Sequence, residues 1–421
     1  MMVKGKEGSC MNETLCKEYA RLVVRVGVHL ERGQILVLTA PIECASFARL
    51  IAEEAFTAGA HDVVMDWGDE LSARLRFMRG KKSLFTEFPD WRRAFYTDYA
   101  EQGAAFVTIA ARDPELFAGI DPEKFTLANQ AAGAALLAYR ERLMSNKNTW
   151  CIVSIPTKSW ARKVFPDCTE EKAVARLWRE IFAAVRVGEG RDAVRAWQEH
   201  IAFLQKAAHF LNESDFERLH YTNALGTDLT IELPKGHIWA GGAERSARGT
   251  LFAANMPTEE VYTLPKRDGV NGKAVATKPL HCNGNLIENF SLTFAEGKVV
   301  SFHAEKGEAV LKELLAMDEG ASYLGEVALV PFDSPIRNSG VLFYNTLFDE
   351  NAACHLALGK AYPTCIEGGA DMDSVTLARH GVNDSLIHAD FMVGSSDLSI
   401  VGVRRSDGKK VQVFRNGNFA F

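Results

Sequence analysis

The sequence predicts an α/β protein with two domains. The N-terminal domain (residues 1–205) should hold a mostly parallel sheet, and the C-terminal α+β domain (residues 206–421) a mixed or antiparallel sheet. Three observations support this. A chain of 421 residues exceeds one ordinary core. In the first half, unbroken apolar runs alternate with helical periodicity, as in a parallel sheet whose strands are buried on both faces. Beyond the helical stretch that ends near residue 211, apolar and polar residues alternate between glycine-containing turns.

The elements of the N-terminal half follow from these patterns. Four apolar runs predict strands: Ile35–Thr39, Asp62–Trp67, Ala105–Ala110 and Cys151–Ile155. Helical spacing predicts three helical stretches: Glu43–Ala58 before Gly59, Pro122–Met144, and most of Cys168–Leu211. Strand connected to strand through a helix is the βαβ pattern, which implies a parallel sheet covered by helices. In the second half, Tyr221–Leu233 predicts strand structure and Glu308–Met317 a helix.

Composition excludes several classes of protein. The chain is 47% hydrophobic and 24% charged, as expected of a globular protein. Its net charge of −6 argues against nucleic acid or an anionic membrane as a partner. No run of about 18 apolar residues predicts a membrane-spanning helix, and the first residues lack the apolar stretch of a signal peptide. Eight cysteines without CxxC spacing predict mostly reduced thiols. We therefore expect a cytoplasmic location.

One stretch in the N-terminal half, Gly188–Ala193, fits the GxGxxA pattern of dinucleotide-binding loops. It follows a helical stretch instead of a strand, and it lies far from the first predicted strand–helix turn. The pattern lacks the context that gives it meaning, so we expect no dinucleotide site there.

The strongest functional signal is a set of acidic and histidine residues in four short segments of the C-terminal half. The segments are Asn255–Pro265, Leu324–Val330, Phe348–Tyr362 and His388–Ser395. They contain Glu259, Glu260, Glu326, Asp349, Glu350, His355, His388 and Asp390. Two imidazoles with several carboxylates suit one or two divalent metal ions. Hydrolysis at a metal centre is the leading hypothesis.

Local spacing supports some of these residues more than others. His388 and Asp390 are two apart before an apolar run, so a strand would direct both side chains to one face. Phe348–Tyr362 predicts a helix on which His355 and Tyr362 lie two turns apart. Glu326 begins a buried strand, where an unpaired carboxylate is costly. Each segment alone also fits an ordinary polar strand face, a core histidine or a solvated glutamate pair.

Taken together and in order, the four segments resemble the M29 metallopeptidases, a family of aminopeptidases. The resemblance implies that Glu260 (or its neighbour Glu259), Glu326, His355, His388 and Asp390 bind metal, and that Tyr362 assists catalysis. It also matches Glu350 to an acidic position that either binds metal or orients another group. It implies cobalt, zinc or magnesium as the metal and a homodimer that acts on short peptides.

The chemistry of such a site can be stated without the family. Two divalent ions about 3.5–4 Å apart can share a carboxylate and activate a water, while one of them holds the free α-amine of a peptide. Zn, Co or Mn suits the ligands, with Mg as a weaker alternative. Glu259 or Glu350 is the candidate general base, and Tyr362 a hydrogen-bond donor to the oxyanion.

Three alternatives remain at this point. The protein could be a metallohydrolase of another amide substrate. It could be a non-catalytic, metal-containing protein that binds peptides or nucleotides. It could also be a thiol hydrolase that uses Cys354 or Cys365 with a histidine, which would need an activated thiolate.

Overall fold

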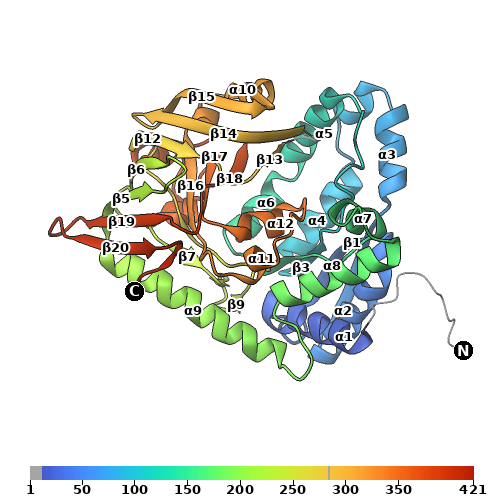
Figure 1. Cartoon of the computed structure of the whole chain (residues 1–421). Coiled ribbons are helices and arrows are strands. Elements are labelled where there is room, and N and C mark those ends of the chain that lie inside the picture. Colours follow the sequence, from blue (N-terminus) through green and yellow to red (C-terminus); the bar gives the residue numbers. More distant parts are fainter. Residues whose placement is uncertain (1–11, 283–284) are drawn as a thin grey trace, which may run out of the picture. The chain divides into compact units, whose positions relative to one another are not determined.

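The computed structural model describes residues 12–282 and 285–421 (Figure 1). The N-terminal stretch without a signal-peptide pattern (residues 1–11) lies outside the described residues, as does its Cys10. The chain forms two compact units. Unit 1 contains residues 1–199, 243–257 and 342–347, and unit 2 contains residues 200–242, 258–341 and 348–421. No helix in the described part of the chain is long and apolar enough to cross a membrane.

Unit 1 is built on a five-stranded sheet in the order β10-β4-β3-β1-β2. All neighbours in it are parallel. Its strands are β1 (Ile35–Pro41), β2 (Asp62–Gly68), β3 (Ala105–Ile109), β4 (Trp150–Val153) and β10 (Asn255–Met256). The first four confirm the predicted strands within about two residues. The fifth could not be anticipated, because a two-residue strand carries no periodicity of its own.

Helices precede or connect these parallel strands. They are α1 (Glu13–Leu22), α2 (Ala45–Ala58), α3 (Glu70–Arg79), α4 (Asp90–Glu101), α5 (Pro122–Ala135), α6 (Leu137–Met144), α7 (Lys158–Val164), α8 (Glu170–Ala184) and the first part of α9 (Ala193–Ser214). Gly59 ends α2 in the left-handed region with a φ of 95°, where glycine has no steric penalty. Short turns lie at η1 (Val23–Gly27), η2 (Ile42–Cys44) and η3 (Lys82–Phe85), and a small hairpin joins β8 (Glu244–Arg245) to β9 (Leu251–Phe252).

Unit 2 contains two antiparallel sheets. The larger has the order β13-β14-β12-β6-β5-β19-β20-β21, with β15 paired to β14. Its strands are β5 (Phe216–Thr222), β6 (Asp228–Glu232), β12 (Val270–Val275), β13 (Leu280–Cys282), β14 (Asn285–Ala295), β15 (Lys298–Lys306), β19 (Ser399–Arg404), β20 (Lys410–Arg415) and β21 (Asn418–Phe419). Helix α10 (Glu308–Leu315) packs against the β14–β15 hairpin (Figure 1).

The smaller sheet of unit 2 has the order β18-β17-β16-β11-β7. Its strands are β7 (Ala240–Gly241), β11 (Val261–Thr263), β16 (Leu324–Leu329), β17 (His355–Gly359) and β18 (His388–Met392). The remaining short elements are η4 (Gly320–Ser322), α11 (Pro335–Asn338), α12 (Thr346–Asp349), η5 (Glu350–Ala352), η6 (Pro363–Cys365), η7 (Gly369–Asp371) and α13 (Ser374–Arg379). The predicted fold class, a parallel α/β half followed by an α+β half, is confirmed.

The helix predicted over Phe348–Tyr362 is wrong. Helix α12 ends at Asp349, a single turn follows, and His355–Gly359 is strand β17 in the interior of the smaller sheet. All five residues of β17 are buried, so the sequence shows no alternation between an apolar and a polar face. A short apolar run of this kind does not distinguish a strand from a helix.

Candidate metal centre

The smaller sheet of unit 2 brings the four acidic and histidine segments together. Glu326 on β16 is paired with Ala357 on β17, and Ala357 is paired with Asp390 on β18. Directly opposed residues of antiparallel strands project to the same face of a sheet. His355 and His388 lie two residues before Ala357 and Asp390, so they share that face.

The opposite face of the sheet belongs to the hydrophobic core. Val327, Leu356 and Phe391 alternate with the polar residues along β16, β17 and β18, and all three are buried in the largest apolar cluster of unit 2. This burial fixes the register, since a slip by one residue would move the carboxylates into the core. Ala357, between Glu326 and Asp390, adds only a methyl group to the polar face.

Five side chains form one compact polar cluster. His355 Nε2 lies 3.2 Å from Glu260 Oε2 and 3.5 Å from Glu326 Oε1. His388 Nε2 lies 3.2 Å from Asp390 Oδ1 and 3.7 Å from the other oxygen of Glu326, Oε2. The cluster therefore consists of two groups, Glu260–Glu326–His355 and Glu326–His388–Asp390, whose ligand atoms lie within 4.8 Å of one another. Glu326 belongs to both groups.

Backbone carbonyls orient both imidazole rings. His355 Nδ1 lies 3.1 Å from the carbonyl oxygen of Ala353, and His388 Nδ1 lies 2.8 Å from that of Lys360. A carbonyl oxygen can only accept, so Nδ1 carries the proton and donates it. Nε2 then points toward the carboxylates. Metal-binding histidines are commonly oriented by this kind of hydrogen bond from the non-ligating nitrogen.

Burial makes the charges of this cluster interdependent. Burial raises the pKa of Glu326 above its usual range. Burial opposes charge on His388, but its hydrogen bond to Asp390 and the negative charges of Asp390 and Glu326 outweigh this and raise its pKa to about 10. Burial also opposes charge on His355, but its hydrogen bonds to Glu260 and Glu326 outweigh this effect and leave its pKa well above the usual value. The cluster therefore favours bound positive charge, which protons supply when no cation is present.

Glu350 and Tyr362 border this cluster. Burial, followed by the charges of Asp390 and Glu260, raises the pKa of Glu350 well above its usual value. Burial and the nearby carboxylates likewise raise the pKa of the Tyr362 phenol. The Tyr362 ring lies 5.2 Å from the His388 ring and 6.0 Å from that of Tyr262, measured between centroids.

Glu259 is directed away from its neighbour Glu260. Its Oε2 lies 3.6 Å from Nε2 of the buried His200 on α9, whereas Glu260 faces His355. Successive residues of an extended segment point to opposite sides, which accounts for the separation. Of the two adjacent glutamates, only Glu260 belongs to the two groups of ligand atoms described above.

Sequence reasoning did not identify three residues around the cluster: His200, Tyr262 and Asn351. His200 lies on a helix far from the four segments in sequence, so no spacing marks it. Tyr262 lies two residues after Glu260, and the strand period of two could have placed both on one face. Asn351 adjoins Glu350 but carries no ionisable group that would attract attention.

The donor set fits divalent cations. Each of the two groups offers imidazole nitrogen and carboxylate oxygen without thiolate, as zinc, cobalt and manganese accept. A cation bound in either group would have three protein ligands from it, one fewer than the four of a closed structural zinc site, which would leave a position for water or substrate.

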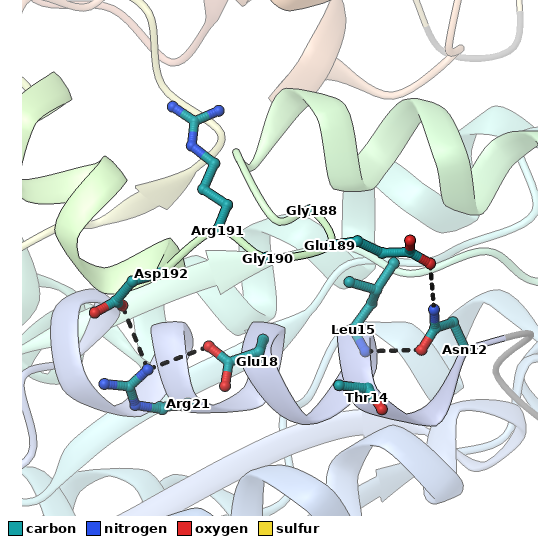
Figure 2. A pocket seen from close by; sticks show the side chains of 10 residues that line it. All are labelled: Asn12, Thr14, Leu15, Glu18, Arg21, Gly188, Glu189, Gly190, Arg191 and Asp192. Carbon is teal, nitrogen blue, oxygen red and sulfur yellow. Dashed lines mark hydrogen bonds and ion pairs between the residues drawn. The ribbon is translucent and has the colours of Figure 1, made fainter.

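The glycine-containing stretch Gly188–Ala193 forms part of a surface pocket in unit 1 (Figure 2). It follows α8 and leads into α9, so no strand precedes it. Asp192 accepts a hydrogen bond from the backbone N–H of Val194 at the start of α9, and Arg21 lies between Glu18 and Asp192. The pocket lining is of mixed charge, with Glu18, Glu189 and Asp192 beside Arg21 and Arg191.

Comparison with known proteins agrees with this geometry. A family model described as thermophilic metalloprotease (M29) matches residues 12–419. Aminopeptidase 2 of Geobacillus stearothermophilus is 48% identical over 404 residues, which cover 96% of this chain and 97% of that protein. Aminopeptidase T of Thermus aquaticus is 42% identical over 400 residues, which cover 95% of this chain and 97% of that protein.

Solved structures agree as well. Wild-type AmpT from Thermus thermophilus superposes with a TM-score of 0.91 at 39% identity and covers 97% of this chain and 100% of its own. A 2,5-dihydroxypyridine dioxygenase from Pseudomonas putida shares the fold at 12% identity, with a TM-score of 0.50. The match covers 97% of this chain and 96% of the dioxygenase chain. The resemblance seen in the four segments is thus confirmed, and the chain belongs to the thermophilic metalloprotease family M29.

Proposed function

We propose that this protein is a two-metal aminopeptidase that removes N-terminal residues from short peptides. The observation that carries the proposal is the pair of ligand groups joined by Glu326 on one face of a sheet. The aminopeptidase names of the relatives support the choice of substrate.

Five residues would hold the two cations. Glu260 and His355 would bind one, His388 and Asp390 the other, and Glu326 would bridge them with its two oxygens, as their separate partners suggest. Zn, Co, Mn or Mg would serve, and when bound such ions acidify a water and polarise the scissile carbonyl.

Glu350 is the residue that we propose as general base. It lies within electrostatic reach of Asp390, Glu260, His355 and Glu326, whereas the alternative candidate, Glu259, faces His200. Glu350 would accept a proton from the attacking water and pass it to the leaving amine, the usual exchange of roles for a carboxylate in hydrolysis.

Tyr362 would donate a hydrogen bond to the oxyanion that develops on the scissile carbonyl. Burial and the surrounding carboxylates hold its pKa well above the usual value, so the phenol keeps its proton at neutral and alkaline pH. A donor of this kind stabilises the transition state more than the ground state.

A free amino terminus would supply a ligand to one of the two proposed cations. A deprotonated α-amine nitrogen carries a lone pair that such a cation accepts, whereas the nitrogen of an N-acetylated terminus is an amide and binds cations poorly. We therefore expect the site to prefer peptides with a free amino terminus.

Release of N-terminal residues from short peptides would test the proposal. Metal-free protein is reloaded with Zn, Co, Mn or Mg and offered free and N-acetylated peptides. We expect turnover of free peptides only, and its loss in Glu326→Gln. Glu288→Gln is the matched control, because Glu288 pairs with Lys306 away from the ligand groups. Absence of turnover with every metal would contradict the proposal, and cleavage of blocked amides would favour a metallohydrolase of another amide.

The thiol-hydrolase alternative lacks an accessible thiolate. Cys354 is 1% exposed, its Sγ lies 3.3 Å from the carbonyl oxygen of Val330, and burial raises its pKa to about 12. Cys365 is equally buried. We expect thiol alkylation to leave activity unchanged and a chelator to abolish it. Loss of activity on thiol alkylation, with activity unchanged by a chelator, would favour a cysteine nucleophile. Binding of peptides without turnover by metal-loaded protein would favour the non-catalytic alternative.

A cytoplasmic homodimer completes the proposal. Helix α3 contains no buried residue and exposes Leu71, Leu75 and Met78 at helical spacing, an apolar stripe that a second copy could cover. Light scattering should give twice the 46.4 kDa chain mass. Cell fractionation would test the location.

A further inference from the structure

The backbone just before Glu260 lies outside any strand yet is buried. Strand β10 ends at Met256 and β11 begins at Val261. Thr258 is 7% exposed and Glu259 4%. Buried backbone N–H and C=O groups need hydrogen-bond partners, and a segment between strands has no neighbouring strand to supply them.

Two side chains from distant parts of the sequence hold one peptide group of this segment. His200 Nε2 donates to the carbonyl oxygen of Thr258 at 2.8 Å, and the N–H of Glu259 donates to Asn351 Oδ1 at 2.7 Å. These bonds engage both polar atoms of the peptide that joins Thr258 to Glu259. His200 is 8% exposed and Asn351 is fully buried.

Asn351 also reaches the proposed general base. Its Nδ2 donates to Glu350 Oε1 at 3.5 Å, a long hydrogen bond. One amide side chain therefore contacts both the backbone preceding Glu260 and the carboxylate of Glu350, although these segments are 92 residues apart along the chain.

We propose that Asn351 and His200 are positioning residues for the metal centre. Together they fix the peptide before Glu260 and so the direction in which its carboxylate meets the first cation, and Asn351 additionally fixes Glu350. This inference rests on the proposed function. Groups that hold metal ligands in place commonly change cation affinity about 10–100-fold when removed, since ligand groups need placement to within about 0.5 Å.

Cation affinity separates a positioning role from simple satisfaction of a buried backbone. We would measure the dissociation constants of Zn and Mn for the full chain by chelator competition, together with the midpoint of denaturant unfolding of the metal-free protein. The variants are Asn351→Ala, His200→Ala and His200→Gln. The control is Asn148→Ala, which removes an equally buried amide that donates to the carbonyls of Ala100 and Ala104 in unit 1.

We expect Asn351→Ala to weaken one of the two cation-binding steps about 10–100-fold and His200→Ala to weaken the same step less, because only Asn351 also contacts Glu350. His200→Gln retains an N–H donor and should recover most of the affinity. Asn148→Ala should lower the unfolding midpoint but leave the affinity unchanged. If Asn351→Ala does not fold, Asn351→Ser replaces it with a hydroxyl in the same space, and the same weakening is expected.

Wild-type affinity in the Asn351 and His200 alanine variants, with lowered unfolding midpoints, would overturn the inference. The same would follow if Asn148→Ala weakened cation binding as much as Asn351→Ala. Failure of the wild-type protein itself to bind cations or cleave peptides would contradict the proposed function instead, so the two failures are distinguishable.

Discussion

At the scale of single residues, the site depends on where a few polar atoms point. Both imidazoles donate Nδ1 to backbone carbonyls and present Nε2 to carboxylates. Glu259 and Glu260 are adjacent in sequence, yet they face different histidines. Roles cannot be assigned to such neighbours from residue type alone, because the side that each faces depends on the path of the backbone.

Removal of the Tyr362 hydroxyl tests its role as a hydrogen-bond donor. We expect Tyr362→Phe to lower kcat about 10²–10³-fold with little change in KM, because the hydrogen bond forms to the oxyanion and not to the bound substrate. Tyr262→Phe, whose ring packs against that of Tyr362, is the control and should keep most of the activity. Steady-state kinetics on a short peptide with a free amino terminus measures both. An equal loss in the two variants would assign Tyr362 a packing role.

The raised pKa of His388 predicts how the metal-free protein responds to pH. The pKa is about 10 in the folded protein, against 6.5 for an ordinary histidine. A raised pKa contributes stability that is fully present below pH 6.5 and is lost as pH rises through about 10. Without cations, the advantage of wild type over His388→Gln in unfolding free energy should therefore shrink between these pH values.

Denaturant unfolding in the presence of a chelator, at steps across that range, measures this difference. The exposed His209, which pairs with Glu213 on the same helix, provides a matched His→Gln control outside the polar cluster. An advantage of wild type that grows with pH would contradict the pairing of His388 with Asp390.

At the scale of elements, the smaller sheet of unit 2 determines the site. The period of two between His388 and Asp390 correctly predicted strand β18 with both side chains on one face. The same period gives no signal at His355, because every residue of β17 is buried and the small Ala357 lacks the polar group that would mark its polar face. Pairing with β16 and β18, which is a tertiary effect, decides its conformation. The sequence therefore identified the residues of the polar cluster but not the strand order that joins them.

Gly359 at the end of β17 tests the importance of this local geometry. Its φ is +100°, and an added Cβ would lie 2.2 Å from the carbonyl oxygen of Ile387, next to His388. We expect Gly359→Ala to lower the free energy of unfolding by about 3 kcal/mol or more, from backbone strain and this collision. Gly408→Ala, also at positive φ but with open space around it, should cost only about 1–2 kcal/mol. Equal losses would show that the contact with Ile387 does not constrain β17.

At the scale of the whole molecule, the candidate metal centre lies within one of two compact units. Glu260, Glu326, His355, His388 and Asp390 all belong to unit 2. The parallel sheet of unit 1 was the easier half to predict, because each of its longer strands has an unbroken apolar run. The discontinuous composition of the units was not predictable, since residues 243–257 and 342–347 return to unit 1 through contacts that no local pattern encodes.

Cation removal should therefore loosen one unit selectively. Binding to the folded state alone stabilises it by about 2.7 kcal/mol at a cation concentration of 100 times Kd. We expect hydrogen exchange after chelation to speed up in β16, β17 and β18, while β1, β2 and β3 of unit 1 stay protected. Restored protection on adding back Zn or Mn is the control. Uniform deprotection of both units would contradict a centre confined to unit 2.

Two cations bridged by Glu326 are the central proposal, and anomalous diffraction from crystals loaded with Mn or Zn tests it most directly. It predicts two peaks about 3.5–4 Å apart. One peak should contact Glu260 and His355, the other His388 and Asp390, with one Glu326 oxygen on each. A single peak, or peaks that Glu326 does not touch, would contradict the account.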